Sequence, residues 1–167
     1  KAPTLISYAD LQKEYEQKGY KLGTSSANDF DGEMGDNPMR RQAEDMHLKS
    51  SATIYPEWDR TSPITYPTSF DVIKLNQIKS DKFSSAYQWI EWEFDVEEAG
   101  LYNITTRFKQ TDRDGAFCNR SVYVNGVIPC EEAKYVHFDY KDGWQVSNLC
   151  APDGTPFLFY FAKGKNT

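Results

Sequence analysis

The 167-residue sequence contains two histidines, His47 and His137, and no long run of apolar residues. Neither histidine belongs to a Gly-x-Ser-x-Gly, His-Glu-x-x-His or Cys-His signature, and the chain has no Gly-rich phosphate loop or dinucleotide fingerprint. A membrane-spanning helix needs about 20 consecutive apolar residues, whereas the mean hydropathy here is -0.71. These absences argue against the common hydrolases, nucleotide-binding enzymes and membrane-spanning proteins.

Positive charge is also scarce. Lys and Arg number 19 against 25 Asp and Glu, which gives a net charge of -6. A nucleic-acid-binding surface needs a basic face to contact phosphates. We therefore expect no nucleic-acid partner.

The cysteine count is low and odd, with Cys118, Cys130 and Cys150. No Cys-x-x-Cys pair and no histidine at zinc-ligand spacing accompanies them. Three reduced, mostly buried thiols that pack as small hydrophobic groups are the favoured interpretation. One disulfide with a free thiol is the alternative for an exported protein.

Acidic pairs occur at Glu91 and Glu93 and at Glu97 and Glu98. Glycosidases place two carboxylates across a sugar bond. Here, however, the first pair falls on outward positions of an expected strand and the second in a tight turn. Solvated charge explains both pairs better, so the sequence predicts a protein that is not an enzyme.

Aromatic residues are abundant, at 15% of the chain, and they favour strands over helices. Apolar and acidic residues alternate over 90–96, and the alternation resumes over 102–108 after a Glu-Glu-Ala-Gly turn. A period of two is typical of a half-buried strand. This pattern predicts a hairpin whose buried face is covered by a second layer.

The remaining elements extend this pattern. Ser7 is a predicted N-cap for a helix over 8–18, which Gly19 ends. Asn125-Gly126 predicts a hairpin turn. The prolines at 56, 63 and 67 predict an extended loop over 55–67, and 164–167 is expected to trail free. Further short strands are predicted at 41–49, 71–75, 120–124, 127–128, 135–140 and 157–161.

Together these elements predict an all-β fold, an antiparallel β-sandwich with a short N-terminal helix. Residues 23–37 are rich in Gly, Ser, Asn and Asp, as in a linker. We therefore expect a helix-and-linker segment over 1–37 and a sandwich domain over 38–167.

Three segments, 42–45, 92–104 and 120–126, resemble carbohydrate-binding modules of families 6 and 35, which are galactose-binding-like jelly rolls. Residues 119–133 and 156–167 are more closely similar to a module of extracellular solute-binding lipoproteins that serve Gram-positive sugar ABC transporters. The resemblance implies a non-catalytic module that binds an oligosaccharide or polysaccharide at the bacterial cell surface. It also implies further covalently attached domains and a lipoprotein anchor in the parent chain.

The two ends of the sequence lead to the same expectation of a longer parent protein. The chain begins at Lys1 rather than Met, and it ends at Thr167, before the final strand of the resembled family. Both features predict a segment of a longer protein.

Flat aromatic side chains stack on the apolar C–H faces of sugars, while polar groups fix the orientation. We expect stacking from Trp58, Tyr87, Trp89 and Trp144, with Arg60 and Arg113 as polar partners. The competing interpretation is that most of these aromatic rings close the ends of the sandwich core.

The resembled families often hold a structural Ca²⁺ at a Glu-x-Glu motif. Here Gln42 and Glu44 occupy those positions, and an amide oxygen can also ligate calcium. An alternative function is a structural or interaction module of a solute-binding lipoprotein that contacts no sugar. A third is a glycosidase or esterase, which needs facing carboxylates or a Ser-His pair.

Overall fold

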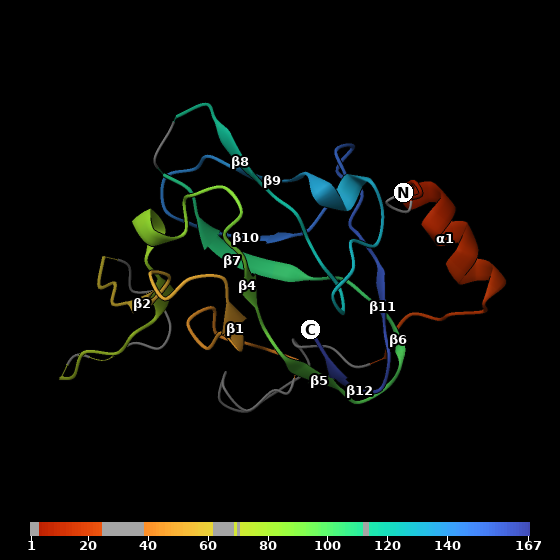
Figure 1. Cartoon of the computed structure of the whole chain (residues 1–167), viewed down its shortest axis with the longest axis horizontal. Coiled ribbons are helices and arrows are strands. Elements are labelled where there is room, and N and C mark those ends of the chain that lie inside the picture. The colour runs from red at the N-terminus through yellow and green to blue at the C-terminus, as the bar shows by residue number, and fades with distance from the viewer. Residues whose placement is uncertain (1–3, 25–38, 62–68, 70, 112–113) are drawn as a thin grey trace. The chain divides into compact units, whose positions relative to one another are not determined.

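The computed structural model describes residues 4–24, 39–61, 69, 71–111 and 114–167 (Figure 1). Short strands dominate, and α1 is the one α-helix within these ranges. This secondary structure confirms the predicted all-β class with a short N-terminal helix.

The chain divides into two compact units. The first unit comprises Lys1–Ser25 and Val96–Asn166, and the second comprises Ser26–Asp95 with Thr167. The domain limits expected from the sequence, 1–37 and 38–167, stay a prediction.

The described strands are two to five residues long and pair two by two. The second unit holds β1 (Leu48–Lys49), β2 (Pro56–Glu57), β3 (Gln77–Ile78), the 3-10 turn η1 (Ser80–Lys82) and β4 (Ile90–Glu91). β5 (Phe94–Val96) runs into the first unit, which holds α1 (Tyr8–Gln17), β6 (Gly100–Tyr102), β7 (Thr105–Lys109), β8 (Phe117–Arg120), η2 (Glu132–Lys134), β9 (Val136–Asp139), β10 (Trp144–Asn148), β11 (Phe159–Phe161) and β12 (Gly164–Asn166).

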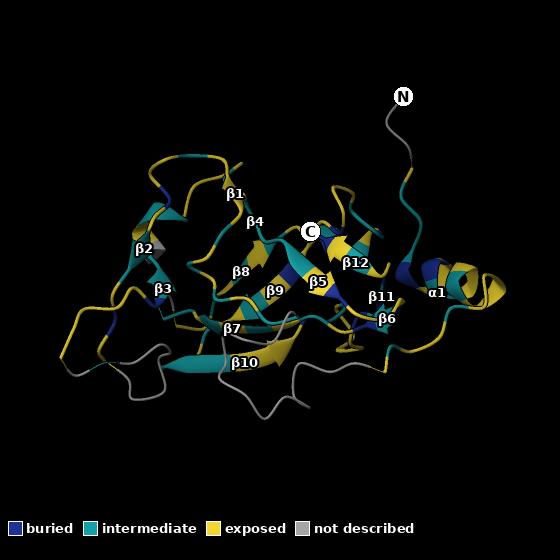
Figure 2. Cartoon of the chain, turned by 90° about the horizontal axis from the view of Figure 1, so that it is seen from below, coloured by how far each residue is buried: buried dark blue, intermediate teal, exposed yellow. Residues whose placement is uncertain are grey.

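Helix α1 forms where the sequence predicts it. The Ser7 hydroxyl accepts a hydrogen bond from the Asp10 backbone N–H at 3.1 Å, as an N-cap does. Gly19 follows the helix with a φ of +70°, the left-handed conformation of many helix ends. Tyr8 and Leu11 are buried, and Figure 2 shows the buried part of α1 at its N-terminal end. One face of the helix therefore packs on the first unit.

The core of the first unit gathers aromatic residues from its C-terminal part. Phe157 and Phe159 are fully buried. The Tyr8 ring meets the Phe157 ring edge-on, with 4.9 Å between centroids. The Tyr8 hydroxyl accepts a hydrogen bond from the Leu158 N–H at 2.7 Å and donates one to the Pro156 carbonyl at 3.2 Å. This single side chain fixes the helix to the segment that leads into β11.

The predicted hairpin between 90–96 and 102–108 is wrong. β4 pairs with β1, β6 pairs with β11, and β7 pairs with β10. On the other side of β6, the Leu101 backbone bonds to Lys21 and Gly23 at 2.8 and 2.9 Å. Gly100 lies so close to this segment that a Cβ there would be 2.7 Å from the Gly23 Cα. Both edges of β6 are therefore taken, and β4 and β7 likewise pair with strands other than each other.

Several local predictions also differ from the structure. Residues 71–75 are exposed and form no strand, and the strand expected over 41–49 is limited to β1. β2 lies within the predicted extended loop, where Pro56 occupies a two-stranded ladder with β3. β8 ends at Arg120, where a strand was expected to begin. The C-terminal residues do not trail free, because Asn166 in β12 is buried and hydrogen-bonds to the Ala162 and Gly164 carbonyls.

Other features are confirmed. Asn125 and Gly126 have positive φ angles of 49° and 79°, and a bridge joins Val124 to Val127 across the predicted turn. β9 and β11 lie within their predicted segments. All three cysteines are free thiols. Cys130 is buried, which raises the pKa of its thiol, while Cys118 and Cys150 are half-buried.

Candidate functional site

The β2–β3 pair of the second unit presents two of the predicted sugar-binding residues. Pro56 pairs with Ile78 and Glu57 with Gln77, and the Asn76 N–H donates to the Glu57 carbonyl at 3.0 Å. The chain leaves β2 into Trp58, Asp59 and Arg60. The ladder therefore fixes where the backbone of these three residues begins.

Buried polar contacts hold the segment after β2. The Asp59 N–H donates to the Asn76 Oδ1 at 2.8 Å, and the Asn76 Nδ2 donates to the Asp59 carbonyl at 3.0 Å. The Asp59 carboxylate accepts from the Thr61 N–H at 2.7 Å. Asp59 and Asn76 are 8% and 7% exposed. Since Asp59 points inward in an extended segment, its two neighbours point outward.

Those neighbours are Trp58 and Arg60, both exposed. The Arg60 guanidinium carbon lies 4.4 Å from the centroid of the Trp58 ring, within cation–π distance. An aromatic face and a set of N–H donors therefore lie side by side. The structure brings together two residues that the sequence predicted separately.

A second exposed ring belongs to Tyr87, in the turn before β4. Its side chain is 98% exposed, and its φ of +65° is in the left-handed region that favours glycine. The Gln88 side chain fixes the turn, because its Oε1 accepts from the Ser85 N–H at 2.9 Å and its Nε2 donates to the Lys82 carbonyl at 2.9 Å. The Tyr87 ring is therefore exposed to solvent at a backbone conformation that is unfavourable for a residue with a Cβ atom.

Trp89 follows this turn and is 49% exposed. Its N–H donates to the Ser50 hydroxyl at 2.9 Å, and its carbonyl accepts from the Ser50 N–H at 3.0 Å. The neighbouring Lys49 Nζ donates to the Ile54 carbonyl. This places Trp89 beside the segment that leads into β2.

Tyr55 is an exposed ring of the same segment, at 39%. The Lys79 Nζ lies 5.7 Å from its centroid and 3.1 Å from the Glu57 Oε1. Contact with the Glu57 carboxylate raises the pKa of Lys79, so this amine stays charged beside the ring. We refer to Tyr55, Trp58, Tyr87 and Trp89 as the exposed aromatic set.

The other predicted site residues lie elsewhere. Trp144 begins β10 in the first unit, where it is half-buried and its indole N–H is buried without a partner among the described residues. The Arg107 guanidinium lies 5.6 Å from its ring centroid. Arg113 lies outside the described residues. The predicted sugar-binding set is therefore divided, with Trp58, Arg60, Tyr87 and Trp89 all in the second unit.

No family model, curated protein or solved structure matches this chain. The roles of the candidate site residues can therefore be inferred only from their geometry in this structure.

Gln42 and Glu44, the predicted calcium ligands, lie in a turn closed by an N–H bond from Asp45 to the Gln42 carbonyl at 3.0 Å. The Gln42 Nε2 is buried with no partner within the described ranges. Burial raises the pKa of the Glu44 carboxyl to about 7, and the Asp45 charge adds to this.

The described residues do not complete a calcium cage. Ca²⁺ takes six to eight oxygen ligands, and among the described ranges no group of three or more His, Cys, Asp or Glu side chains gathers. The two side chains thus supply the right donor chemistry but only part of a coordination shell.

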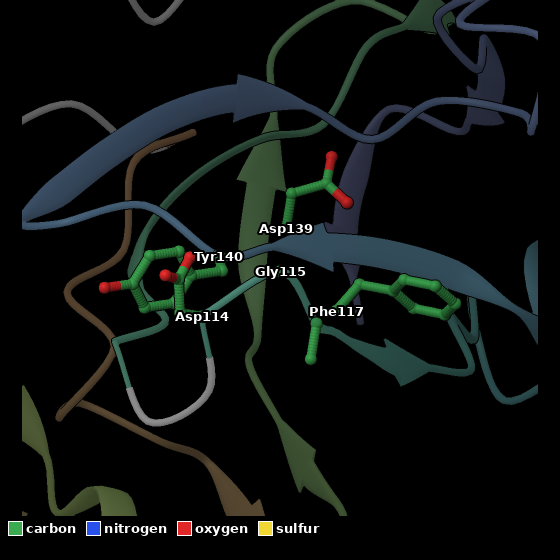
Figure 3. A pocket seen from close by; sticks show the side chains of 6 residues that line it. Asp114, Gly115, Phe117, Asp139 and Tyr140 are labelled. Atoms are coloured by element: carbon green, nitrogen blue, oxygen red, sulfur yellow. The ribbon is translucent and has the colours of Figure 1, made fainter.

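A hollow of about 300 Å³ lies in the first unit at the start of the β8–β9 pair (Figure 3). Two carboxylates, two aromatic rings and a Gly-Ala turn line it: Asp114, Gly115, Ala116, Phe117, Asp139 and Tyr140. No local pattern indicates it, because Asp114 and Asp139 are far apart in a chain rich in acidic residues. Only the register that pairs Phe117 with Asp139 brings its parts together.

The described part of the chain contains no helix with the length and apolar composition needed to cross a bilayer.

Proposed function

We propose that this chain is a non-catalytic carbohydrate-binding module with a jelly-roll sandwich architecture. The single observation that carries the proposal is Tyr87, an aromatic ring almost wholly in solvent on a left-handed backbone. A non-glycine residue in this conformation costs roughly 1–2 kcal/mol, and an exposed ring recovers little of that through burial. A residue that lowers stability without packing is best explained by contact with a ligand.

The surrounding residues supply the rest of a sugar site. Trp58 and Trp89 offer further exposed rings, and Arg60 offers donors beside one of them. Aromatic stacking with a few hydrogen bonds at a shallow, wet surface gives roughly 10–1,000 μM affinity. The proposed ligand is an oligosaccharide or polysaccharide, bound by the second unit.

The proposed setting is the bacterial cell surface. The resemblance to modules of solute-binding lipoproteins supports a role in sugar uptake or glycan capture, with further domains on the same polypeptide and a lipid anchor in the parent chain. The net charge of -6 supports a partner other than nucleic acid.

Isothermal titration with a panel of neutral plant and host oligosaccharides tests the proposal. At least one should bind, and Trp58→Ala should weaken that binding at least tenfold, by the loss of one stacked ring. Tyr123→Asn is the matched control, because it removes a 57% exposed tyrosine from the first unit. No binding by the folded protein to any of the sugars would overturn the proposal.

We also propose that the Gln42 and Glu44 side chains supply two oxygens to a structural Ca²⁺, with backbone carbonyls and water as further ligands. The support is the donor chemistry, because carboxylate and amide oxygens two residues apart are ligands that Ca²⁺ takes. Added Ca²⁺ should raise the melting temperature of the wild type but not that of Glu44→Gln. An equal rise in both proteins would contradict this assignment.

One observation favours a different function, an interaction module that contacts no sugar. Residues 71–75 present Val72, Ile73 and Leu75 to solvent at 54%, 68% and 50% exposure. Large exposed apolar groups mark protein contacts when they are contiguous. Hydrogen exchange at the amides of 71–75 can be compared between this chain and a longer fragment that includes the neighbouring domain of the proposed parent chain. If the longer fragment protects these amides and no sugar binds, the interaction module replaces the carbohydrate-binding module as the proposed function.

A further inference from the structure

The β8–β9 pair of the first unit carries a face that the proposed site does not use. Phe117 and Asn119 on β8 and His137 and Asp139 on β9 are all exposed, and their alternation places them on one face. The Phe117 and His137 rings are stacked, with 4.3 Å between centroids and 11° between planes. This pre-ordered aromatic pair adjoins the hollow that Phe117 and Asp139 line.

The hollow itself is built on backbone contacts. The Tyr140 N–H donates to the Ala116 carbonyl at 3.0 Å, and the Gln145 Nε2 donates to the Asp139 carbonyl at 2.9 Å. In Figure 3, the Phe117 and Tyr140 side chains lie to either side of Gly115, and Asp139 rises from the paired strand. All four of these residues line the hollow together with Asp114 and Ala116.

The charge of this lining has one sign. Neither Asp114 nor Asp139 forms an ion pair within the described residues, and the six lining residues include no cationic side chain. Carboxylates attract a cation, and the faces of Phe and Tyr rings also favour one. The two aspartates of the hollow belong to no group of three or more His, Cys, Asp or Glu side chains among the described residues. A ligand with both an apolar face and a positive charge fits this lining best.

We propose that the hollow binds an amino sugar that carries a free ammonium group. The ammonium lies between the Asp139 and Asp114 carboxylates, and the C–H face of the sugar ring rests on Phe117 or Tyr140. A volume of about 300 Å³ is at the lower end of small-molecule sites, so one sugar residue fits. This site is in the first unit and does not depend on the exposed aromatic set of the second.

The test compares a β-linked glucosamine trisaccharide with its fully N-acetylated counterpart in the same buffer. The two probes share their stacking faces but differ in charge. We expect the free amine to bind at least tenfold more tightly, with chemical-shift changes at the backbone amides of 114–117 and 139–140. Equal affinity for the two probes, or shifts elsewhere only, would overturn the proposal.

Variants locate the charge recognition. Asp139→Asn and Asp114→Asn should each remove most of the preference for the amine, and circular dichroism checks that each variant is folded. Glu97→Gln, an exposed carboxylate that does not line the hollow, should leave the preference unchanged. If Glu97→Gln weakens amine binding as much as the two aspartate variants do, net charge rather than the hollow binds the amine, and the proposal fails.

Trp58→Ala separates the two sites. Amine binding in the hollow should survive this change, whereas neutral sugars bound by the second unit should be lost. If Trp58→Ala abolishes amine binding too, the amine occupies the second unit and the hollow is not its site. If neutral sugars fail to bind the wild type while the amine binds the hollow, only the proposed function fails.

Discussion

Asp59 and Asn76 are joined by two hydrogen bonds that run in opposite directions, from the Asp59 N–H to the Asn76 side chain and from that side chain back to the Asp59 carbonyl. Both residues are buried, and the other buried residue among those described in this unit is Ile54. The hydrogen bonds between Asp59 and Asn76 therefore fix the extended segment that carries Trp58 and Arg60, a role that apolar packing has elsewhere in the chain.

Asn76→Ala should consequently reduce both stability and sugar binding. It removes the two hydrogen bonds that the Asn76 side chain makes to buried backbone groups of Asp59, at a cost of about 1–3 kcal/mol. Urea unfolding measures the loss, and titration with a bound sugar measures the change in affinity. Asn119→Ala, at an exposed site in β8, should change the free energy of unfolding by less than about 0.5 kcal/mol. Comparable losses in the two variants would refute the structural role of Asn76.

Tyr87→Asn should separate stability from function. Asparagine tolerates the left-handed backbone better than tyrosine, so the free energy of unfolding should rise by roughly 0.5–1 kcal/mol. Sugar affinity should fall at least tenfold, because the exposed ring is lost. A variant that is less stable than the wild type, or one that binds sugar equally well, contradicts our explanation of the strained turn. Urea unfolding and calorimetric titration give the two readouts.

Glu44 predicts a pH dependence of stability. Its folded pKa is about 7, above the unfolded value of about 4.3. The carboxyl is protonated in both states below the unfolded pKa, so its contribution to stability is fully present there and is lost as the pH rises through about 7. In buffer with a chelator, the wild type should lose stability across this window and Glu44→Gln should lose less. Parallel pH profiles for the two proteins would rule out a desolvated Glu44 carboxyl.

Tyr8→Phe should loosen helix α1 while it keeps the ring that packs on Phe157. The change removes the acceptor for the Leu158 N–H and the donor to the Pro156 carbonyl. We expect a loss of about 1–2 kcal/mol and faster hydrogen exchange at the α1 amides. Unchanged exchange in α1 would show that the hydroxyl does not fix the helix.

Local signals in the sequence predicted local structure. Ser7 and Gly19 marked the ends of α1, and Asn125-Gly126 marked a turn, because capping and positive φ depend on nearby residues. The pairing of the alternating segments could not be predicted in the same way. β4 pairs with β1 and β7 with β10, while β6 lies between residues 21–23 and β11. All these partners are far away in the sequence, so no local signal indicates them.

The candidate site was predictable in part for a related reason. Exposed loops rich in aromatic residues indicated Trp58, Tyr87 and Trp89, and the structure shows each of them at least 37% exposed. The supporting residues, Asn76 and Lys79, gave no signal because their roles arise from the β2–β3 register. The hollow beside β8 likewise depends on strand register.

The most direct test of the central claim is a ¹H–¹⁵N spectrum of the tryptophan indole N–H groups during titration with oligosaccharides. The resonances of Trp58 and Trp89 should shift together with the added sugar. That of Trp92, whose N–H donates to the Ala43 carbonyl at 3.1 Å, should stay in place as an internal control. If no sugar in the panel moves the Trp58 and Trp89 resonances of the folded protein, the second unit is not a carbohydrate-binding surface.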